Sequence, residues 1–356
     1  MQGRLEDVLA EAVPAVCPAA VALIAVDGTV VAAAAAGELV RYTDEDGTLA
    51  TQRPPAQRDS LFDLASISKL FTTAALLSLA EEGRLDLDEP VVRWLPEHYA
   101  ERRHITLRHL LSHTAGLQPT RRPDLELPQG GHDERLELVL STPITQPVGG
   151  PYLYTDVGMV TAGRIAELAG RAPLDRLVSE RVTGPLGLAD TCYRPGLELL
   201  PRVAATECRP HGCTRGVVHD ETAASIGGVA GHAGLFSTAD DVLRFGEMLR
   251  LGGGPVLKPE TVAEMVRDQG ATGAAFRQGL GVRLGDPAIV GPLAGGFGHS
   301  GFTGTSLVVE PSLRLTVVVL TNAVHPLRGR PGIRELRHAV ATVAAVAAVA
   351  TQEAAR

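Results

Sequence analysis

Two strongly apolar segments lie near the start of the chain and two more near its end, and we expect all four to be strands of a single sheet. Asp27-Gly28 separates the first two segments and is a dipeptide typical of a two-residue hairpin turn. A Glu-Pro-Ser turn separates the last two, and a long helix is predicted from about Gly332. Another helix is predicted over residues 2–12. The four predicted strands cover residues 21–26, 29–35, 306–309 and 315–320.

The middle of the chain is dominated by helical patterns. From about Ser66 to Leu200, apolar residues recur at helical spacing between prolines and glycines. We therefore expect an α+β fold, an α/β sandwich whose antiparallel sheet is built from residues 1–75 and 215–356 and flanked by helices. A mainly helical domain, residues 76–214, is inserted between these parts. A ligand-binding cleft is expected where the two domains meet.

Charge and composition limit the classes of molecule that this chain is expected to bind. Its 356 residues are 45% hydrophobic, and its net charge of −8 comes without any basic block. This distribution argues against a nucleic-acid groove or an anionic membrane as partner, and favours small molecules. The opening "MQGRLEDVLAEAVPAV" carries acidic residues where a secretory signal has a basic start, which predicts a cytoplasmic protein. No nucleotide or flavin motif is present, so no cofactor is expected, and nothing indicates the oligomeric state.

Four cysteines are present, and free thiols are the expected state in a cytoplasmic chain. Two of them fall in "CRPHGC", where Cys208, His211 and Cys213 lie close together in sequence. Their spacing matches no common zinc pattern, so we expect ordinary loop residues here and no metal. A metal site and a surface disulfide remain the alternatives.

Residues 62–83, "FDLASISKLFTTAALLSLAEEG", place a serine and a lysine three positions apart at the start of a predicted helix. Residues at this spacing share one face, so the Ser66 hydroxyl and the Lys69 amine can enter the same pocket. A serine becomes a good nucleophile when a neighbouring base takes its proton, which a lysine does if its pKa is lowered. Burial and the positive end of the helix dipole are expected to lower the pKa of Lys69. A capping serine with a solvated lysine is the alternative.

Two further segments carry groups suited to the same chemistry. In "GPYLYTDVGMV", a loop delivers Tyr154 and Asp156 directly before a helix. A phenol beside a lysine can act as general base, and Asp156 can orient the lysine or accept from a substrate amide. In "GGFGHSGFTGTS", glycine-rich backbone leads into a strand, where exposed N–H groups can form an oxyanion hole.

The three motifs, in this order, resemble those of serine hydrolases related to class C β-lactamases, D-alanyl-D-alanine peptidases and β-lactamase-like esterases. The resemblance extends from about Val21 to Asn322. It implies that Ser66 is the acyl-accepting nucleophile, Lys69 its partner base and Tyr154 a proton relay. It further implies an oxyanion hole from the backbone N–H groups of Ser66 and Phe302. On the opposite wall, the implied substrate-binding residues are His299, Ser300 and Gly301, with Asp156 beside the lysine.

Two supporting segments are typical of the family and are interpreted as structural. These are "LLSHTAGL", in which His113 caps a turn, and the glycine loop over residues 227–234. The chain also departs from many β-lactamases, since Asp156 stands in place of Asn and His299 in place of a lysine. Both changes weaken the attraction for a substrate carboxylate, and so favour esters or neutral amides over β-lactams.

The expected activity is acyl transfer through a Ser66 ester, with hydrolysis of a small ester or amide as the first hypothesis. The high Ala, Arg, Gly and Pro content is typical of actinomycete proteins, where this fold also serves biosynthesis, so an ester- or amide-forming acyltransferase is the alternative. The partners are then a small acyl donor and a second, nucleophilic acceptor. A D-alanyl-D-alanine carboxypeptidase, a β-lactamase and a non-catalytic penicillin sensor are the remaining alternatives.

Overall fold

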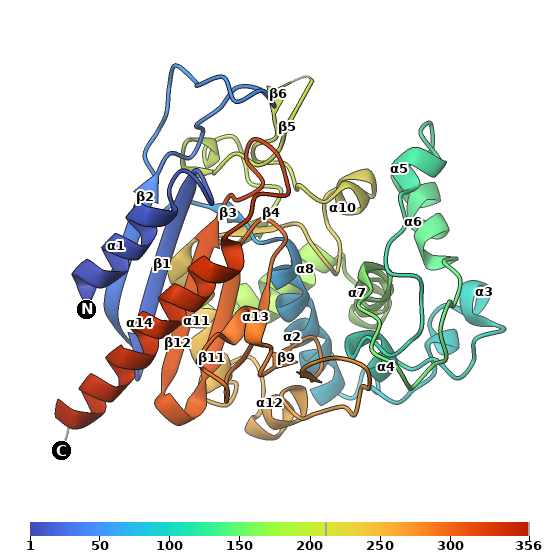
Figure 1. Cartoon of the computed structure of the whole chain (residues 1–356). Helices are drawn as coiled ribbons and strands as arrows, with labels where there is room; N and C mark the ends of the chain where they lie inside the picture. Colours follow the sequence, from blue (N-terminus) through green and yellow to red (C-terminus); the bar gives the residue numbers. More distant parts are fainter. Residues whose placement is uncertain (211, 355–356) are drawn as a thin grey trace.

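The computed structural model describes residues 1–210 and 212–354 and contains one seven-stranded antiparallel sheet (Figure 1). The strand order is β2-β1-β12-β11-β10-β9-β8, so β1 from one end of the chain pairs with β12 from the other. The strands are β1 (Ala19–Val26), β2 (Thr29–Gly37), β8 (Arg277–Gln278), β9 (Arg283–Leu284), β10 (Phe297–Ser300), β11 (Ser306–Glu310) and β12 (Leu315–Thr321). The predicted sheet and its four predicted strands are confirmed.

The β1–β2 hairpin turns where the sequence indicated. Asp27 and Gly28 both have positive φ angles, 52° and 78°. Two successive residues of this kind form a type I′ turn, whose twist matches that of antiparallel strands.

Successive residues of β1 enter two separate cores, one on each face of the sheet. Val21 and Leu23 pack into the core under α2 (Ser68–Glu81) and α11 (Ala239–Arg250), and α11 lies directly on β1, β11 and β12. Ala22 and Ile24 pack into the core under the two terminal helices, α1 (Gln2–Ala12) and α14 (Ile333–Ala354) (Figure 1). Both predicted terminal helices are confirmed, and the sheet is covered on both faces.

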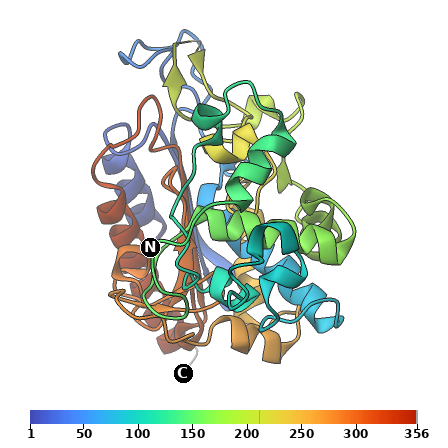
Figure 2. The ribbon, with the colours of Figure 1, turned by 90° about the vertical axis from the view of Figure 1, so that its right-hand side faces the viewer.

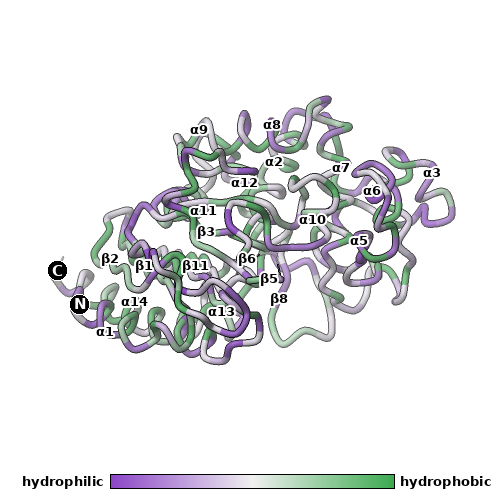
Figure 3. The backbone as a smooth tube through the Cα atoms, turned by 90° about the horizontal axis from the view of Figure 1, so that it is seen from above, coloured by the Kyte–Doolittle hydropathy of each residue, from purple (hydrophilic) through white to green (hydrophobic). Residues whose placement is uncertain are grey.

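Most helices of the middle of the chain gather on the side of the molecule away from α1 and α14 (Figures 2 and 3). Here α7 packs against α2, α4, α6 and α8, and so joins this region to the sheet. These helices are α3 (Pro96–Tyr99), α4 (Leu107–Leu111), α5 (Pro123–Glu126), α6 (His132–Leu140), α7 (Asp156–Gly170), α8 (Leu174–Val178) and α9 (Gly184–Leu186). Among the described residues, none of the helices combines the length and apolar character needed to cross a membrane.

A second, three-stranded sheet has the order β3-β7-β4 and ends directly before the Ser66 turn. Its strands are β3 (Phe62–Asp63), β4 (Cys192–Tyr193) and β7 (Leu235–Ser237). The other α-helices and strands of the described residues are α10 (Glu221–Ser225), α12 (Pro259–Met265), α13 (Pro287–Val290), β5 (Cys208–Arg209) and β6 (Gly212–Cys213). The second sheet fixes the position at which the chain enters the candidate site.

Candidate active site

Ser66 lies in a short 3-10 turn, Ala65–Ile67, between β3 and α2. The buried Asp63 holds this turn, because its carboxylate accepts the backbone N–H of Ala65 at 2.8 Å and that of His219 at 2.7 Å. Ala65 has a φ of 46°, a conformation that costs energy for a residue with a side chain. Asp63 therefore stabilises the strained backbone that presents Ser66, a role that the motifs did not indicate.

Lys69 is fully buried at the start of α2 and donates hydrogen bonds to three acceptors. Its Nζ lies 2.9 Å from Ser66 Oγ, 2.7 Å from an Asp156 carboxylate oxygen and 3.3 Å from the backbone oxygen of His232. The predicted meeting of Ser66 and Lys69 is thus present in the structure. Of the two roles considered for Asp156, the geometry shows the first, because its carboxylate orients the lysine.

The prediction that the pKa of Lys69 is lowered is wrong. Burial does lower the pKa of this amine, but the Asp156 charge and its hydrogen bond at 2.7 Å, together with the nearby Tyr154, outweigh it, and the net shift is upward. An opposite charge at hydrogen-bond distance favours the ionised form of a group. Lys69 is therefore an ammonium in the resting protein, where it holds the Ser66 oxygen and has no lone pair for the Ser66 proton.

Tyr154 approaches Ser66 from the loop before α7. Its hydroxyl oxygen lies 2.9 Å from Ser66 Oγ, so the Ser66 oxygen is held by both the phenol and Lys69. The His113 ring packs against the Tyr154 ring at a centroid distance of 4.7 Å, and His113 Nδ1 accepts the backbone N–H of Thr155 at 3.3 Å. Burial lowers the pKa of His113 well below its usual value, so the ring is neutral. This geometry supports the structural interpretation of His113, which positions the Tyr154 loop.

The opposite wall is the end of β10. His299 is buried, its Nδ1 donates to the Ser300 backbone oxygen at 2.8 Å, and burial together with the nearby cations lowers its pKa well below the usual value. A neutral His299 carries no charge to attract a carboxylate. The next residue, Ser300, is partly exposed. Gly301 permits a close approach, since a Cβ there would lie 2.4 Å from the Leu64 backbone oxygen. The wall therefore meets the Ser66 turn only because residue 301 is glycine.

The backbone N–H groups of Ser66 and Phe302 were predicted to form the oxyanion hole. Within residues 1–210 and 212–354, neither group donates a hydrogen bond to the protein. Both remain free to donate to a substrate oxygen, and their role stays a prediction.

Arg283 is a cation at the site that sequence reasoning missed. Its guanidinium carbon lies 5.0 Å from the ring centroids of both Tyr154 and Phe276, and one nitrogen donates to Asp286 at 3.0 Å. Burial lowers the pKa of Arg283, but the nearby tyrosines and Asp286 raise it above its usual value. Arg283 belongs to β9, a two-residue strand with no recognisable periodicity, so its position became apparent only from the pairing of β9 with β10.

The prediction of free thiols in the "CRPHGC" segment is wrong. Cys208 and Cys213 face each other across the β5–β6 hairpin and form a disulfide, while Cys17 and Cys192 are free; His211 lies outside the described residues. The register explains the bond, because a cross-strand pair brings two side chains into contact.

His325 completes a group of possible metal ligands with the two bonded cysteines. However, His325 Nε2 accepts the backbone N–H groups of Arg41 and Tyr42 at 3.1 and 3.0 Å, and Nδ1 donates to the Thr206 backbone oxygen at 2.8 Å. Both ring nitrogens are thus used by the protein. We interpret this cluster as structural, because His325 links residues 41–42 to Thr206, two residues before the β5–β6 hairpin.

Known proteins resemble this chain over most of its length. The family model described as Beta-lactamase matches residues 6–342. A putative D-alanyl-D-alanine carboxypeptidase from Escherichia coli strain K12 is 32% identical over 346 residues, which cover 85% of this chain and 78% of that protein.

Solved structures show the same fold. EstCE1, described as a hydrolase with promiscuous acyltransferase activity, is 27% identical, with a TM-score of 0.75 over 94% of this chain and 98% of its own. Unliganded simvastatin synthase LovD from Aspergillus terreus is 22% identical, with a TM-score of 0.75 over 98% of each chain. The chain belongs to the beta-lactamase family of serine acyl-transfer enzymes, and its fold is the β-lactamase/transpeptidase-like fold.

Proposed function

We propose that the protein transfers acyl groups through an ester on Ser66, and that its main reaction is hydrolysis of a small ester or amide. One observation carries this proposal: the Ser66 oxygen is held at 2.9 Å by both the Lys69 ammonium and the Tyr154 hydroxyl. A serine acts as a nucleophile when its proton has an acceptor and its developing charge has a neighbouring cation.

The proposed first step forms the bond between Ser66 Oγ and the substrate carbonyl carbon. Since Lys69 is an ammonium, the Tyr154 hydroxyl first releases its proton to solvent, and the Lys69 charge, 4.8 Å from the centre of the Tyr154 ring, stabilises the phenolate that remains. The phenolate oxygen then takes the Ser66 proton. The carbonyl oxygen becomes an oxyanion that accepts from the N–H groups of Ser66 and Phe302. Collapse re-forms the carbonyl and breaks the bond to the leaving alcohol or amine, which receives the proton from Tyr154.

The second step decides between hydrolase and acyltransferase. Tyr154 takes a proton from the incoming acceptor, which attacks the Ser66 ester and releases Ser66 with its proton restored. Water as acceptor gives hydrolysis, and an alcohol or amine gives acyl transfer. The likeness to EstCE1, whose description names both activities, supports hydrolysis as the main reaction and acyl transfer as the alternative.

A second candidate function is carboxypeptidase action on a peptide that ends in a free carboxylate. Arg283 favours it, because a guanidinium beside Tyr154 and His299 can bind a carboxylate through two hydrogen bonds. The Asp156 charge opposes such a substrate less than the sequence suggested, since Lys69 neutralises it at 2.7 Å. The similarity to putative D-alanyl-D-alanine carboxypeptidases supports the same candidate.

The test is the intact mass of the protein after brief exposure to p-nitrophenyl acetate, to a penicillin and to a peptide ending in D-alanyl-D-alanine. Each is measured alone and with an added alcohol or amine. We expect an acetyl adduct that disappears in water. An adduct that persists until the acceptor arrives would make the protein an acyltransferase instead.

The Ser66→Ala variant should form no adduct and keep the melting temperature of the wild type. Ser78→Ala is the matched control on the same helix, because Ser78 contacts Arg181 on the outside and lies away from the site. Adduct formation by Ser66→Ala, or turnover at the wild-type rate, would refute the proposal.

A further inference from the structure

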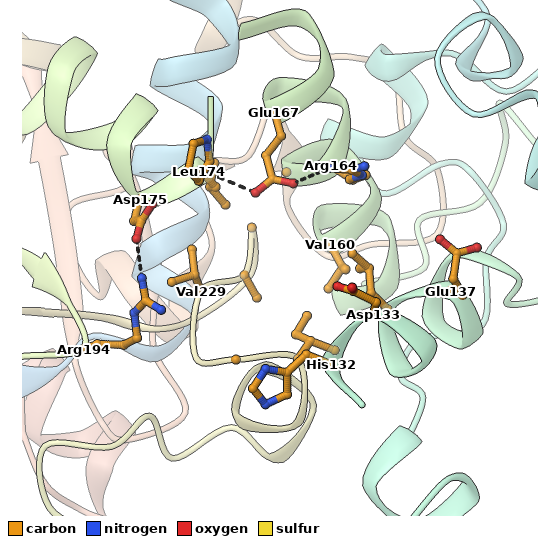
Figure 4. A pocket seen from close by; sticks show the side chains of 17 residues that line it. His132, Asp133, Glu137, Val160, Arg164, Glu167, Leu174, Asp175, Arg194 and Val229 are labelled. Carbon is orange, nitrogen blue, oxygen red and sulfur yellow. Dashed lines mark hydrogen bonds and ion pairs between the residues drawn. The ribbon is translucent and has the colours of Figure 1, made fainter. Parts of the chain in front are cut away.

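A cavity away from Ser66 lies between α6, α7, the start of α8 and residues 226–231 (Figure 4). Its volume of about 590 Å³ is in the range of small-molecule sites. Part of its lining is apolar, from Val160, Leu174, Ile226 and Val229. Neither Ser66 nor Tyr154 contributes to it, so a molecule bound there would not meet the nucleophile.

Carboxylates outnumber cations among the charged side chains of this cavity. Both guanidiniums are already paired, Arg164 with Glu167 at 2.9 Å and Arg194 with Asp175 (Figure 4). Glu137 lies 2.6 Å from the His98 ring, whereas Asp133, at the rim, forms no ion pair with any described residue. The carboxylates are Asp133, Glu137, Glu167 and Asp175. The cavity therefore favours a ligand with a positive charge and disfavours an anion.

Two of the walls of this cavity belong to the segments that supply acceptors to Lys69. One wall is α7, which begins at Asp156, the ion-pair partner of Lys69. The other is the 226–231 segment, and the next residue, His232, accepts from Lys69 through its backbone oxygen. The walls touch where Gly231 lies on α7, because a Cβ on Gly231 would fall 2.0 Å from the Met159 backbone oxygen. A ligand that separates these walls would displace the acceptors of Lys69.

We infer that this cavity is an effector site for a small amphiphilic amine, whose binding lowers the reactivity of Ser66. The ammonium lies among the carboxylates at the rim, and the hydrocarbon body covers the apolar part of the wall. Binding depends only on the cavity. The effect on rate rests on the proposed acyl transfer and is measured separately.

The experiment uses N,N-dimethyl-2-phenylethylamine, a tertiary amine that forms no stable amide. Calorimetry should show saturable one-site binding, with a Kd on the order of 1 mM or tighter. The neutral 2-phenylethyl methyl ether and the anionic 3-phenylpropanoate should bind at least about tenfold more weakly. At saturation the amine should lower kcat for p-nitrophenyl acetate at least about twofold.

Asp133→Lys, an exposed change at the start of α6, should weaken amine binding about tenfold, since like charges repel. The matched control is Glu335→Lys, another exposed acid in the first turn of a helix, α14, which should bind as the wild type does. Absence of saturable binding, equal affinity for the ether, or unchanged affinity in Asp133→Lys would overturn the site. Binding with an unchanged kcat would overturn its effector role, and a protein without esterase activity would still leave the binding test intact.

Discussion

The two ends of the seven-stranded sheet differ in length and in chemistry. Next to the edge strand β2, β1 pairs with β12 over seven residues, from Ala20–Thr321 to Val26–Leu315, and both of these strands are buried throughout. At the other end, β8 and β9 have two residues each, and they carry Gln278 and Arg283. Long apolar strands stabilise the fold, whereas the short strand β9 brings Arg283 to Tyr154 and His299. Stability and chemistry should therefore be separable by mutation.

The largest expected effect is at the catalytic end. Tyr154→Phe removes the hydroxyl at 2.9 Å from Ser66 Oγ and should lower the acylation rate by about 10²–10⁴-fold, as loss of a general base does. The measurement is the single-turnover rate with p-nitrophenyl acetate. Tyr99→Phe is the matched control, because its hydroxyl lies 3.3 Å from the buried Thr161 and makes no other hydrogen bond within the described residues. A loss below tenfold in Tyr154→Phe would exclude it as the base.

Leu23→Ala tests whether the long strands β1 and β12 contribute stability without affecting catalysis. Leu23 is fully buried in the middle of β1, and its truncation should reduce the free energy of unfolding by about 2–5 kcal/mol. Urea denaturation measures this loss, and kcat per folded molecule should stay within about twofold of the wild type. A large change in kcat would show that the two ends are coupled.

Arg283→Gln tests the chemistry of the short strands alone, because it changes a side chain of β9 and leaves the apolar core unchanged. For a peptide that ends in a carboxylate, kcat/KM should fall about 10–100-fold, the usual effect of removing a charged hydrogen-bond partner. For a neutral ester it should change less than about threefold. Arg277→Gln, an exposed arginine on β8, is the control. Equal losses for both substrates would remove Arg283 from carboxylate binding.

The smallest expected effect is the change in the free energy of unfolding with pH that His325 causes. Burial lowers the pKa of His325 from 6.5 to about 4. A histidine that is neutral in the folded state contributes stability above pH 6.5, and this contribution is lost as the pH falls toward 4. We expect a loss of about 1–2 kcal/mol between pH 7 and pH 5, measured by urea denaturation. His325→Asn should show a flatter dependence, and an identical dependence would refute the assignment.

The sequence predicted those elements that a local pattern of residues specifies. The hairpin at Asp27-Gly28, the terminal helices and the order of the three motifs depend on local patterns, and these predictions matched the structure. What it missed depends on contacts between distant segments. Arg283 reaches the site only through pairing of β9 with β10, and the pKa of the buried Lys69 is raised, chiefly because Asp156 comes within 2.7 Å.

The pairing of β1 with β12 also sets the order in which the protein can fold during synthesis. The side chain of Asn322 accepts the backbone N–H of Ala19, a contact between residues 303 positions apart. The ribosome has therefore released α2 with Ser66 and Lys69, and all of the middle helices, long before β1 can find its partner. Contacts of such high sequence separation make folding slow. Until then the apolar β1–β2 hairpin lacks its neighbour, which makes it a segment where a chaperone is expected to bind the nascent chain.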